Sequence, residues 1–123
     1  MPDAREVLRG RRIMIVEDEM LVAMELEALL AEQGCAVIGP APTADRALAL
    51  LAEGLPDAAI LDVNLNGQTA TPVAAALRAQ NVPFLIATGY SQSLQAELKD
   101  TPRVDKPVNH ERLVRVLTQL LGG

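Results

Sequence analysis

The stretch Ile13–Glu19 reads IMIVEDE, which is four apolar residues followed at once by three acids. An unbroken apolar run of this length is typical of a strand buried on both faces, as in a parallel sheet. From there the chain alternates short apolar runs with amphipathic segments. Alternating strands and helices predict an α/β domain of five strand–helix units, whose parallel sheet is covered by helices on both faces.

The expected elements follow from hydrophobic spacing and from the residues that bound each run. Thr43 and Asn109 are expected to cap helices, and Gly34 and Gly54 to end them. Residues 39–42, which read GPAP, are expected to break the chain after the second strand. Strands are expected at 13–16, 35–38, 58–61, 83–87 and 102–105, with helices at 20–33, 44–53, 72–77 and 110–121 and only a weak one at 91–99.

The composition limits both the fold and the function. The 123 residues fit one domain, which we place at 12–121, after a short and frayed lead-in at 1–11. Half of the residues are apolar but only 2% are aromatic, so the core must be built mainly from Ala, Leu, Val and Ile. The net charge of −5 argues against DNA or RNA as the main ligand, because a phosphate backbone requires a basic face.

Cys35 is the only cysteine, which excludes a disulfide within the chain and fits a reducing compartment. No apolar run is long enough to span a membrane. The first twelve residues lack the apolar segment of a secretory signal. We therefore expect a cytoplasmic protein without membrane contact.

Chemically active side chains follow four of the predicted strands, and ligands of open α/β sheets bind at the carboxyl ends of strands. The acids 17–19 follow the first strand, Asp62 the third, Thr88 the fourth and Lys106 the fifth. Crowded carboxylates repel one another, and a divalent cation such as Mg²⁺ relieves that repulsion with oxygen ligands. A hydroxyl and an ammonium beside them suit phosphoryl transfer, in which a carboxylate can be the nucleophile.

Each of these features also has an ordinary interpretation. Acids after a strand are often loop residues or helix caps, a Thr-Gly pair is often a turn, and Lys-Pro before a helix is common. His110, the sole histidine, is best interpreted as a surface residue of the last helix rather than as a phosphoryl carrier. The specific signal is the combination, since four such elements in order at the same ends of successive strands are unlikely by chance.

With these motifs, residues 12–121 resemble the receiver domains of two-component response regulators, the CheY-like superfamily. The resemblance implies a flavodoxin-like, doubly wound (βα)5 fold with strand order 2-1-3-4-5. It also implies that Asp62 accepts a phosphoryl group with Mg²⁺. The other implied roles are Glu17 and Asp18 as the acidic pair, Asn64 as a metal ligand through its backbone carbonyl, Thr88 as the switch hydroxyl, Lys106 as the phosphoryl contact, and Pro107 as its cis-proline partner.

A narrower resemblance is carried by Pro83–Tyr90, which reads PFLIATGY and is similar to the "FATGUY" single-domain receivers. In that subgroup the fourth helix is short or degenerate. Many receivers place an aromatic residue two positions before the lysine, where this chain has Val104. We therefore hypothesise that Tyr90 takes part in the switch instead. Gly89 has no side chain and should leave the phosphoryl group accessible.

The leading functional hypothesis is a phosphorylated signalling receiver that is not a turnover enzyme. A histidine kinase or histidine phosphotransfer protein would supply the phosphoryl group, and output would pass through protein–protein contact or a phosphorelay. The alternatives are an interaction module that works without phosphorylation, or a receiver fragment of a longer regulator or hybrid kinase. A phosphatase is disfavoured because Asp62-x-Asn64 lacks the second acid of that class.

Overall fold

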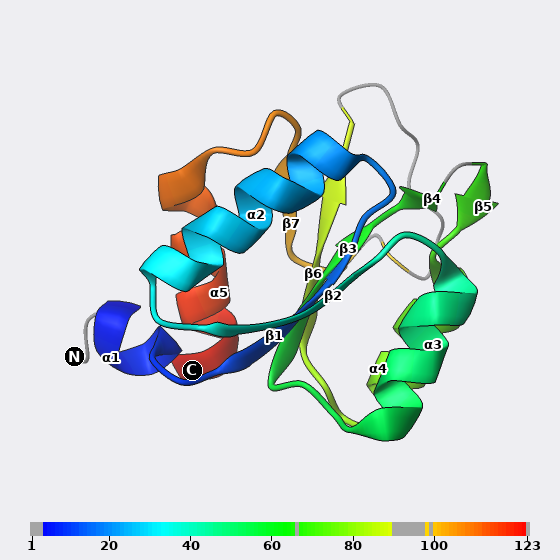
Figure 1. The fold of residues 1–123 in the computed structure, drawn as a ribbon, viewed down its shortest axis with the longest axis horizontal. Coiled ribbons are helices and arrows are strands. Elements are labelled where there is room, and N and C mark those ends of the chain that lie inside the picture. Colours follow the sequence, from blue (N-terminus) through cyan, green and yellow to red (C-terminus); the bar gives the residue numbers. More distant parts are fainter. Residues whose placement is uncertain (1–3, 66, 90–97, 99, 123) are drawn as a thin grey trace.

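The computed structural model describes residues 4–65, 67–89, 98 and 100–122, and its centre is a five-stranded parallel sheet (Figure 1). The strands lie in the order β2-β1-β3-β6-β7. Because β6 and β7 are the fourth and fifth strands of this sheet along the chain, the expected order 2-1-3-4-5 is confirmed. The strands are β1 (Arg12–Val16), β2 (Ala36–Ala41), β3 (Ala58–Asp62), β6 (Phe84–Thr88) and β7 (Arg103–Asp105).

Helices cover both faces of the sheet, with α2 and α5 on one side and α3 and α4 on the other (Figure 1). Successive residues of a strand point to opposite faces, and β1 illustrates this. Its Ile13 and Ile15 belong to the apolar layer under α2 and α5, whereas Met14 and Val16 belong to the layer under α3 and α4. The helices are α1 (Ala4–Leu8), α2 (Met20–Glu32), α3 (Ala44–Glu53), α4 (Thr71–Ala79) and α5 (His110–Gly122).

Helices α3 and α5 begin at the capping residues expected from the sequence. The hydroxyl of Thr43 accepts a hydrogen bond from the backbone N–H of Arg46 at 3.1 Å. The side chain of Asn109 accepts one from the N–H of Arg112 at 2.9 Å. These bonds satisfy backbone donors that the first turn of a helix leaves unpaired. The caps predicted before α3 and α5 are therefore confirmed.

The second strand differs from the expectation, because it continues through Gly39 and Pro40 to Ala41 instead of breaking. The register with β1 shifts between Met14 and Val16, and the N–H of Glu17 then donates to the carbonyl of Ala41 at 2.9 Å. Gly39 permits the shift: its φ is +96°, and a Cβ there would lie 2.9 Å from the backbone oxygen of Ile15. A glycine within a strand can mark such an irregularity. The same residue in the sequence also resembles a break between elements, which is why the strand was expected to end before Gly39.

The segment expected to be a frayed lead-in contains helix α1, which packs against α5. Val7 and Leu8 are buried in the same apolar layer as Leu113 and Leu117 of α5. Burial of these two side chains gives the short helix its stability, so the expectation was wrong for residues 4–8. The division at 12 between lead-in and domain stays a prediction.

Gly67 lies in a turn between two short antiparallel strands, β4 (Asn64–Leu65) and β5 (Gln68–Thr69). The weak helix expected at 91–99 lies outside the described residues, apart from the buried Leu98. Within the described part of the chain, every helix is too short or too polar to traverse a lipid bilayer.

Candidate functional site

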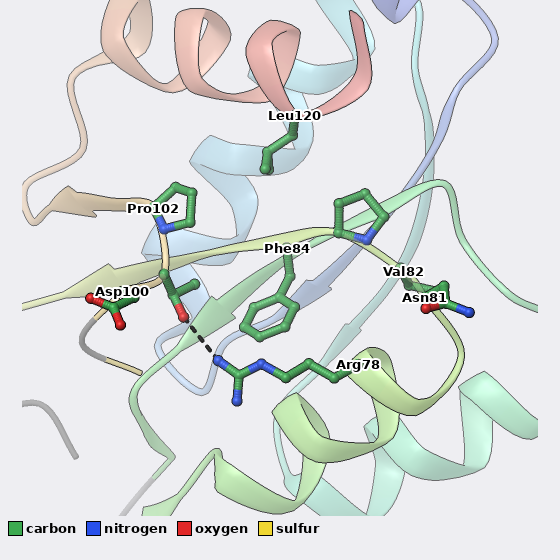
Figure 2. A pocket seen from close by; sticks show the side chains of 9 residues that line it. Arg78, Asn81, Val82, Phe84, Asp100, Pro102 and Leu120 are labelled. Atoms are coloured by element: carbon green, nitrogen blue, oxygen red, sulfur yellow. Dashed lines mark hydrogen bonds between the residues drawn. The ribbon is translucent and has the colours of Figure 1, made fainter. Parts of the chain in front are cut away.

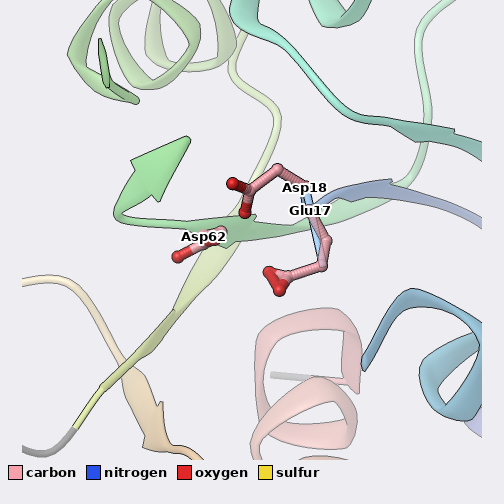
Figure 3. Close-up of side chains that lie close together, drawn as sticks. All are labelled: Glu17, Asp18 and Asp62. Atoms are coloured by element: carbon pink, nitrogen blue, oxygen red, sulfur yellow. The ribbon is translucent and has the colours of Figure 1, made fainter. Parts of the chain in front are cut away.

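Three carboxylates meet at the carboxyl edge of the sheet (Figure 3). Asp62 is the last residue of β3, and Glu17 and Asp18 directly follow β1, its neighbour in the sheet. One carboxylate oxygen from each of the three lies within 4.8 Å of the others. Glu17 is 3% exposed and Asp62 is 2% exposed, so two of these acids are held away from water.

Lys106, which follows β7, supplies the positive charge of the site. Its ammonium lies 2.8 Å and 3.1 Å from the two carboxylate oxygens of Glu17, and 3.4 Å from Oδ2 of Asp62. Burial disfavours the charged ammonium, but the hydrogen bond that the ammonium donates to Glu17 and the charge of Asp62 outweigh this effect, so the pKa of Lys106 lies above its ordinary value. The lysine is therefore a permanent cation beside Asp62.

The environment of Asp62 disfavours its ionised form. Burial is the largest cause, followed by the negative charge of Glu17, and together they raise the pKa of Asp62 to about 7. The charge of Lys106 and a hydrogen bond of 3.2 Å from the N–H of Asn64 act in the opposite direction without cancelling the shift. One ammonium thus does not neutralise the clustered acids, and a further cation would relieve the excess charge.

The residues present fit a hard divalent cation such as Mg²⁺. The donor set is oxygen only, and Mg²⁺ typically takes one or two carboxylates while it keeps several waters. A hollow of about 290 Å³ next to the acids leaves space for those waters. Its lining residues are Asp18, Glu19, Asp62, Asn64, Gly67, Gly89 and Lys106.

Thr88 joins the site from the end of β6 and is buried. Its hydroxyl donates to the carbonyl of Gly89 at 3.2 Å, and its own carbonyl accepts the backbone N–H of Lys106 at 2.8 Å. The peptide bond between Lys106 and Pro107 is cis, as the resemblance implies. These bonds tie the loop that carries the lysine to the strand that carries the hydroxyl.

Two positions bear on the predicted switch. Val104 is buried in the middle of β7, where its register partner is Ala87. An aliphatic core residue thus stands where many receivers have an aromatic one. Tyr90, which we expect to take part instead, lies outside the described residues.

Sequence reasoning missed the part that Glu19 plays. Its carboxylate lies 3.3 Å from the Lys106 ammonium, so the lysine contacts three acids rather than two. The signal was present, because Glu19 directly follows the acidic pair in the sequence. A third consecutive acid is by itself also typical of a solvated loop, and only the structure brings it to the lysine.

A second hollow, of about 450 Å³, lies at the opposite edge of the sheet, near the start of β6 (Figure 2). The Arg78 guanidinium lies 5.3 Å from the centre of the Phe84 ring and donates to the hydroxyl of Thr101 at 3.1 Å. Asp100 is the only acid among its described lining residues. The described residues that line this hollow include no counterpart of the clustered acids and lysine, so we place the chemistry at the carboxyl edge.

The response regulator receiver domain family matches residues 13–118 by its sequence model. The chain belongs to this family. It is therefore a receiver of the kind used in two-component systems, as its sequence motifs predicted. Such receivers are in general signalling modules rather than turnover enzymes. The narrower likeness to the FATGUY subgroup rests on residues 83–90 and stays a prediction.

Known receivers resemble this one over most of its length. The sensory transduction protein LytT of Bacillus cereus is 33% identical over 111 residues, which are 86% of this chain and 45% of LytT. The solution structure of SdrG from Sphingomonas melonis is 41% identical with a TM-score of 0.83, covering 98% of this chain and 99% of that one. SdrG has also been solved in a BeF3-activated conformation.

The crystal structure of the response regulator PhyR from Brucella abortus is 31% identical with a TM-score of 0.81, covering 95% of this chain and 51% of PhyR. The chain spans less than half the length of the curated relatives that it matches.

Proposed function

We propose that this receiver accepts a phosphoryl group on Asp62 from the phosphohistidine of a histidine kinase or a histidine phosphotransfer protein. The observation that carries the proposal is the contact of 3.4 Å between the Lys106 ammonium and the buried Asp62 carboxylate, with the acids Glu17 and Asp18 alongside. Phosphoryl transfer depends mainly on positioning and on positive charge around the transferred group. The site supplies both.

The transfer exchanges the P–N bond of the phosphohistidine for a P–O bond to Asp62. A carboxylate oxygen of Asp62 attacks the phosphorus, the P–N bond of the phosphohistidine breaks, and the leaving imidazole keeps the electron pair and takes a proton from solvent. The product is an acyl phosphate on Asp62. In the return step a water oxygen attacks the phosphorus, the bond to the Asp62 oxygen breaks, and inorganic phosphate leaves while a proton passes to solvent.

The other residues would act on the charge that this step creates. Lys106 and the hydroxyl of Thr88 would donate hydrogen bonds to the phosphoryl oxygens, as donors that the fold already places at the carboxyl edge of the sheet. Asp18 and Asp62, with the backbone carbonyl of Asn64 and support from Glu17, would hold Mg²⁺. When bound, the ion neutralises charge on the phosphoryl oxygens and lowers the pKa of Asp62, so that the nucleophile is ionised.

An exposed apolar surface next to the site supports a protein as the phosphoryl donor. Three large apolar side chains at the start of α2 are exposed, with Leu21 at 81% and Met20 at 75% of their surface. A hollow of about 330 Å³, lined mainly by apolar atoms of α2 and the β2–α3 segment, adjoins Met20 and Met24. Exposed apolar clusters of this kind mark protein contact sites. A helix of the donor that packs here would bring its phosphohistidine close to Asp62.

We further propose that the output passes through contact of the phosphorylated receiver with another cytoplasmic protein, or through a relay to a second phosphotransfer protein. SdrG, which is 44% identical to this chain, has a BeF3-activated conformation, and this supports activation of the present receiver by a phosphoryl group. In this proposal Thr88 and Tyr90 report the phosphoryl group to the surface, and Gly89 keeps the group accessible.

The test is incorporation of phosphate from acetyl phosphate in the presence of Mg²⁺. The wild-type receiver and Asp105→Asn should incorporate one phosphate each, and Asp62→Asn none. Asp105 is a matched control, because its side chain lies at the same sheet edge and is 66% exposed. Equal incorporation by Asp62→Asn and wild type would falsify the assignment. A folded wild type that takes up no phosphate would favour an interaction module that works without phosphorylation.

A further inference from the structure

Glu19 lies at the N-cap of α2, a position whose side chain normally stabilises the helix by capping it. It is the N-cap residue of α2, with φ −86° and ψ 113°, yet its side chain makes no capping hydrogen bond. Ser, Thr, Asp and Asn are the usual residues here, because their short side chains reach the unpaired backbone N–H groups of the first turn. The carboxylate of Glu19 instead reaches Lys106, with Oε1 3.3 Å from the ammonium.

The contact of Glu19 is the one that Lys106 can release most easily. The ammonium has three hydrogens and lies near three acids: Glu17, Glu19 and Asp62. The side chains of Glu17 and Asp62 are 1% and 2% exposed, whereas that of Glu19 is 63% exposed. Water can therefore replace Lys106 as the partner of Glu19, but not readily as the partner of the buried acids.

A phosphoryl group on Asp62 would need a hydrogen bond from the same ammonium. From this geometry we infer that Glu19 is a positioning residue, which holds Lys106 toward the mouth of the site and competes with the incoming phosphoryl group for it. The inference rests on the proposed function of Asp62. If Glu19 competes in this way, the wild-type receiver is phosphorylated more slowly than it would be without the contact between Glu19 and Lys106.

Two variants of Glu19 distinguish an effect of its contact with Lys106 from an effect of its negative charge alone. Glu19→Gln removes the charge, and it should raise the rate of phosphorylation by acetyl phosphate about two- to fivefold, the effect expected of a partly exposed ion pair. Glu19→Asp keeps the charge but shortens the side chain, and Asp at an N-cap turns toward the helix N–H groups. It should also accelerate phosphorylation and should raise the melting temperature.

The matched control is Glu32→Gln, which makes the same change at the exposed last residue of α2, far from Lys106. It should leave the rate unchanged. A second readout follows the lysine itself: the NMR resonance of the Lys106 side chain in the metal-free protein should move in Glu19→Gln and Glu19→Asp, and stay in place in Glu32→Gln.

The outcomes are distinct. An unmoved Lys106 resonance, or a wild-type rate in Glu19→Gln, overturns the inference. Acceleration by Glu19→Gln with a wild-type rate in Glu19→Asp also overturns it, because charge alone would then be the cause. If the wild type takes up no phosphate although the resonance moves, the proposed function fails and the competition fails with it, while the contact between Glu19 and Lys106 stands.

Discussion

The ammonium of Lys106 lies 3.4 Å from the carboxylate of Asp62, although 44 positions separate the two residues in the chain. Parallel pairing produces this proximity, because β3 and β7 flank β6 and all three strands end at the same edge of the sheet. The same lysine binds Glu17 from the end of β1. One cation thus connects the carboxyl ends of the first, third and last strands of the chain's main sheet.

Replacement of Lys106 by Ala should slow phosphorylation of Asp62 by about 10²-fold, the usual cost of removing one donor aimed at a developing negative charge. The buried acids would also lose the cation that offsets their repulsion. The measurement is the initial rate of phosphate incorporation from acetyl phosphate at saturating Mg²⁺. A rate within twofold of wild type would show that Lys106 does not contact the phosphoryl group.

The raised pKa of Asp62 predicts how stability depends on pH in the absence of metal. The pKa is about 7 in the folded chain and 3.8 for an ordinary Asp, so the folded state binds more protons between these values. Stability due to this group is therefore complete below about pH 4 and is lost as the pH rises through 7.

Asp62→Asn should remove that loss. In a chelator at pH 8 the variant should be more stable than wild type by up to about 4 kcal/mol, and at pH 4 the difference should vanish. Urea unfolding at several pH values measures both. Mg²⁺ should reduce the difference at pH 8 by stabilising the wild type. A difference that does not change with pH would mean that Asp62 has an ordinary pKa in the folded protein.

If the exposed apolar surface of α2 binds the donor protein, a substitution there should slow transfer from that protein but not phosphorylation by acetyl phosphate. Leu21→Gln should slow phosphoryl transfer from a phosphorylated donor protein by about tenfold. A loss of this size is typical when a side chain that contributes substantially to an interface is replaced. It should leave phosphorylation by acetyl phosphate unchanged, since Leu21 does not line the hollow beside Asp62. Leu55→Gln is the control, because Leu55 is also exposed but precedes β3 at the other edge of the sheet. Equal rates of transfer from the donor protein to Leu21→Gln and Leu55→Gln would show that this surface is not part of the interface.

The packing of α1 predicts a stability effect close to the N-terminus. Leu8 is fully buried against the α5 side of the sheet, so Leu8→Ala should lower the free energy of unfolding by about 2–5 kcal/mol. The check is urea unfolding beside Met24→Ala, which truncates an exposed apolar residue and should cost much less. A loss below about 1 kcal/mol for Leu8→Ala would indicate that α1 does not stay docked.

The sheet and most of the site could be predicted because local signals and topology agree. Apolar runs located the strands, the side chains of Thr43 and Asn109 located two helix starts, and the ends of parallel strands must meet at one edge. The side chains that follow four of the strands, which are the acids 17–19, Asp62, Thr88 and Lys106, were therefore predicted to meet there.

The remaining features depend on contacts between distant residues. Gly39 and Pro40 carry the signal of a break, yet β2 continues through them, because Gly39 has no Cβ to collide with the Ile15 carbonyl where the register shifts. Val7 and Leu8 form a helix because α5 offers them an apolar surface. Glu19 resembles a solvated loop acid until the fold places Lys106 3.3 Å away. Periodicity and capping rules do not contain this information.

Binding of beryllium fluoride, a phosphoryl mimic, tests the central claim most directly. With the wild-type receiver, fluorine NMR should detect a signal of bound beryllium fluoride, and this signal should require Mg²⁺. The signal should be absent in Asp62→Asn and present in Asp105→Asn. A bound signal that persists in Asp62→Asn, or that forms equally well without Mg²⁺, would contradict the account.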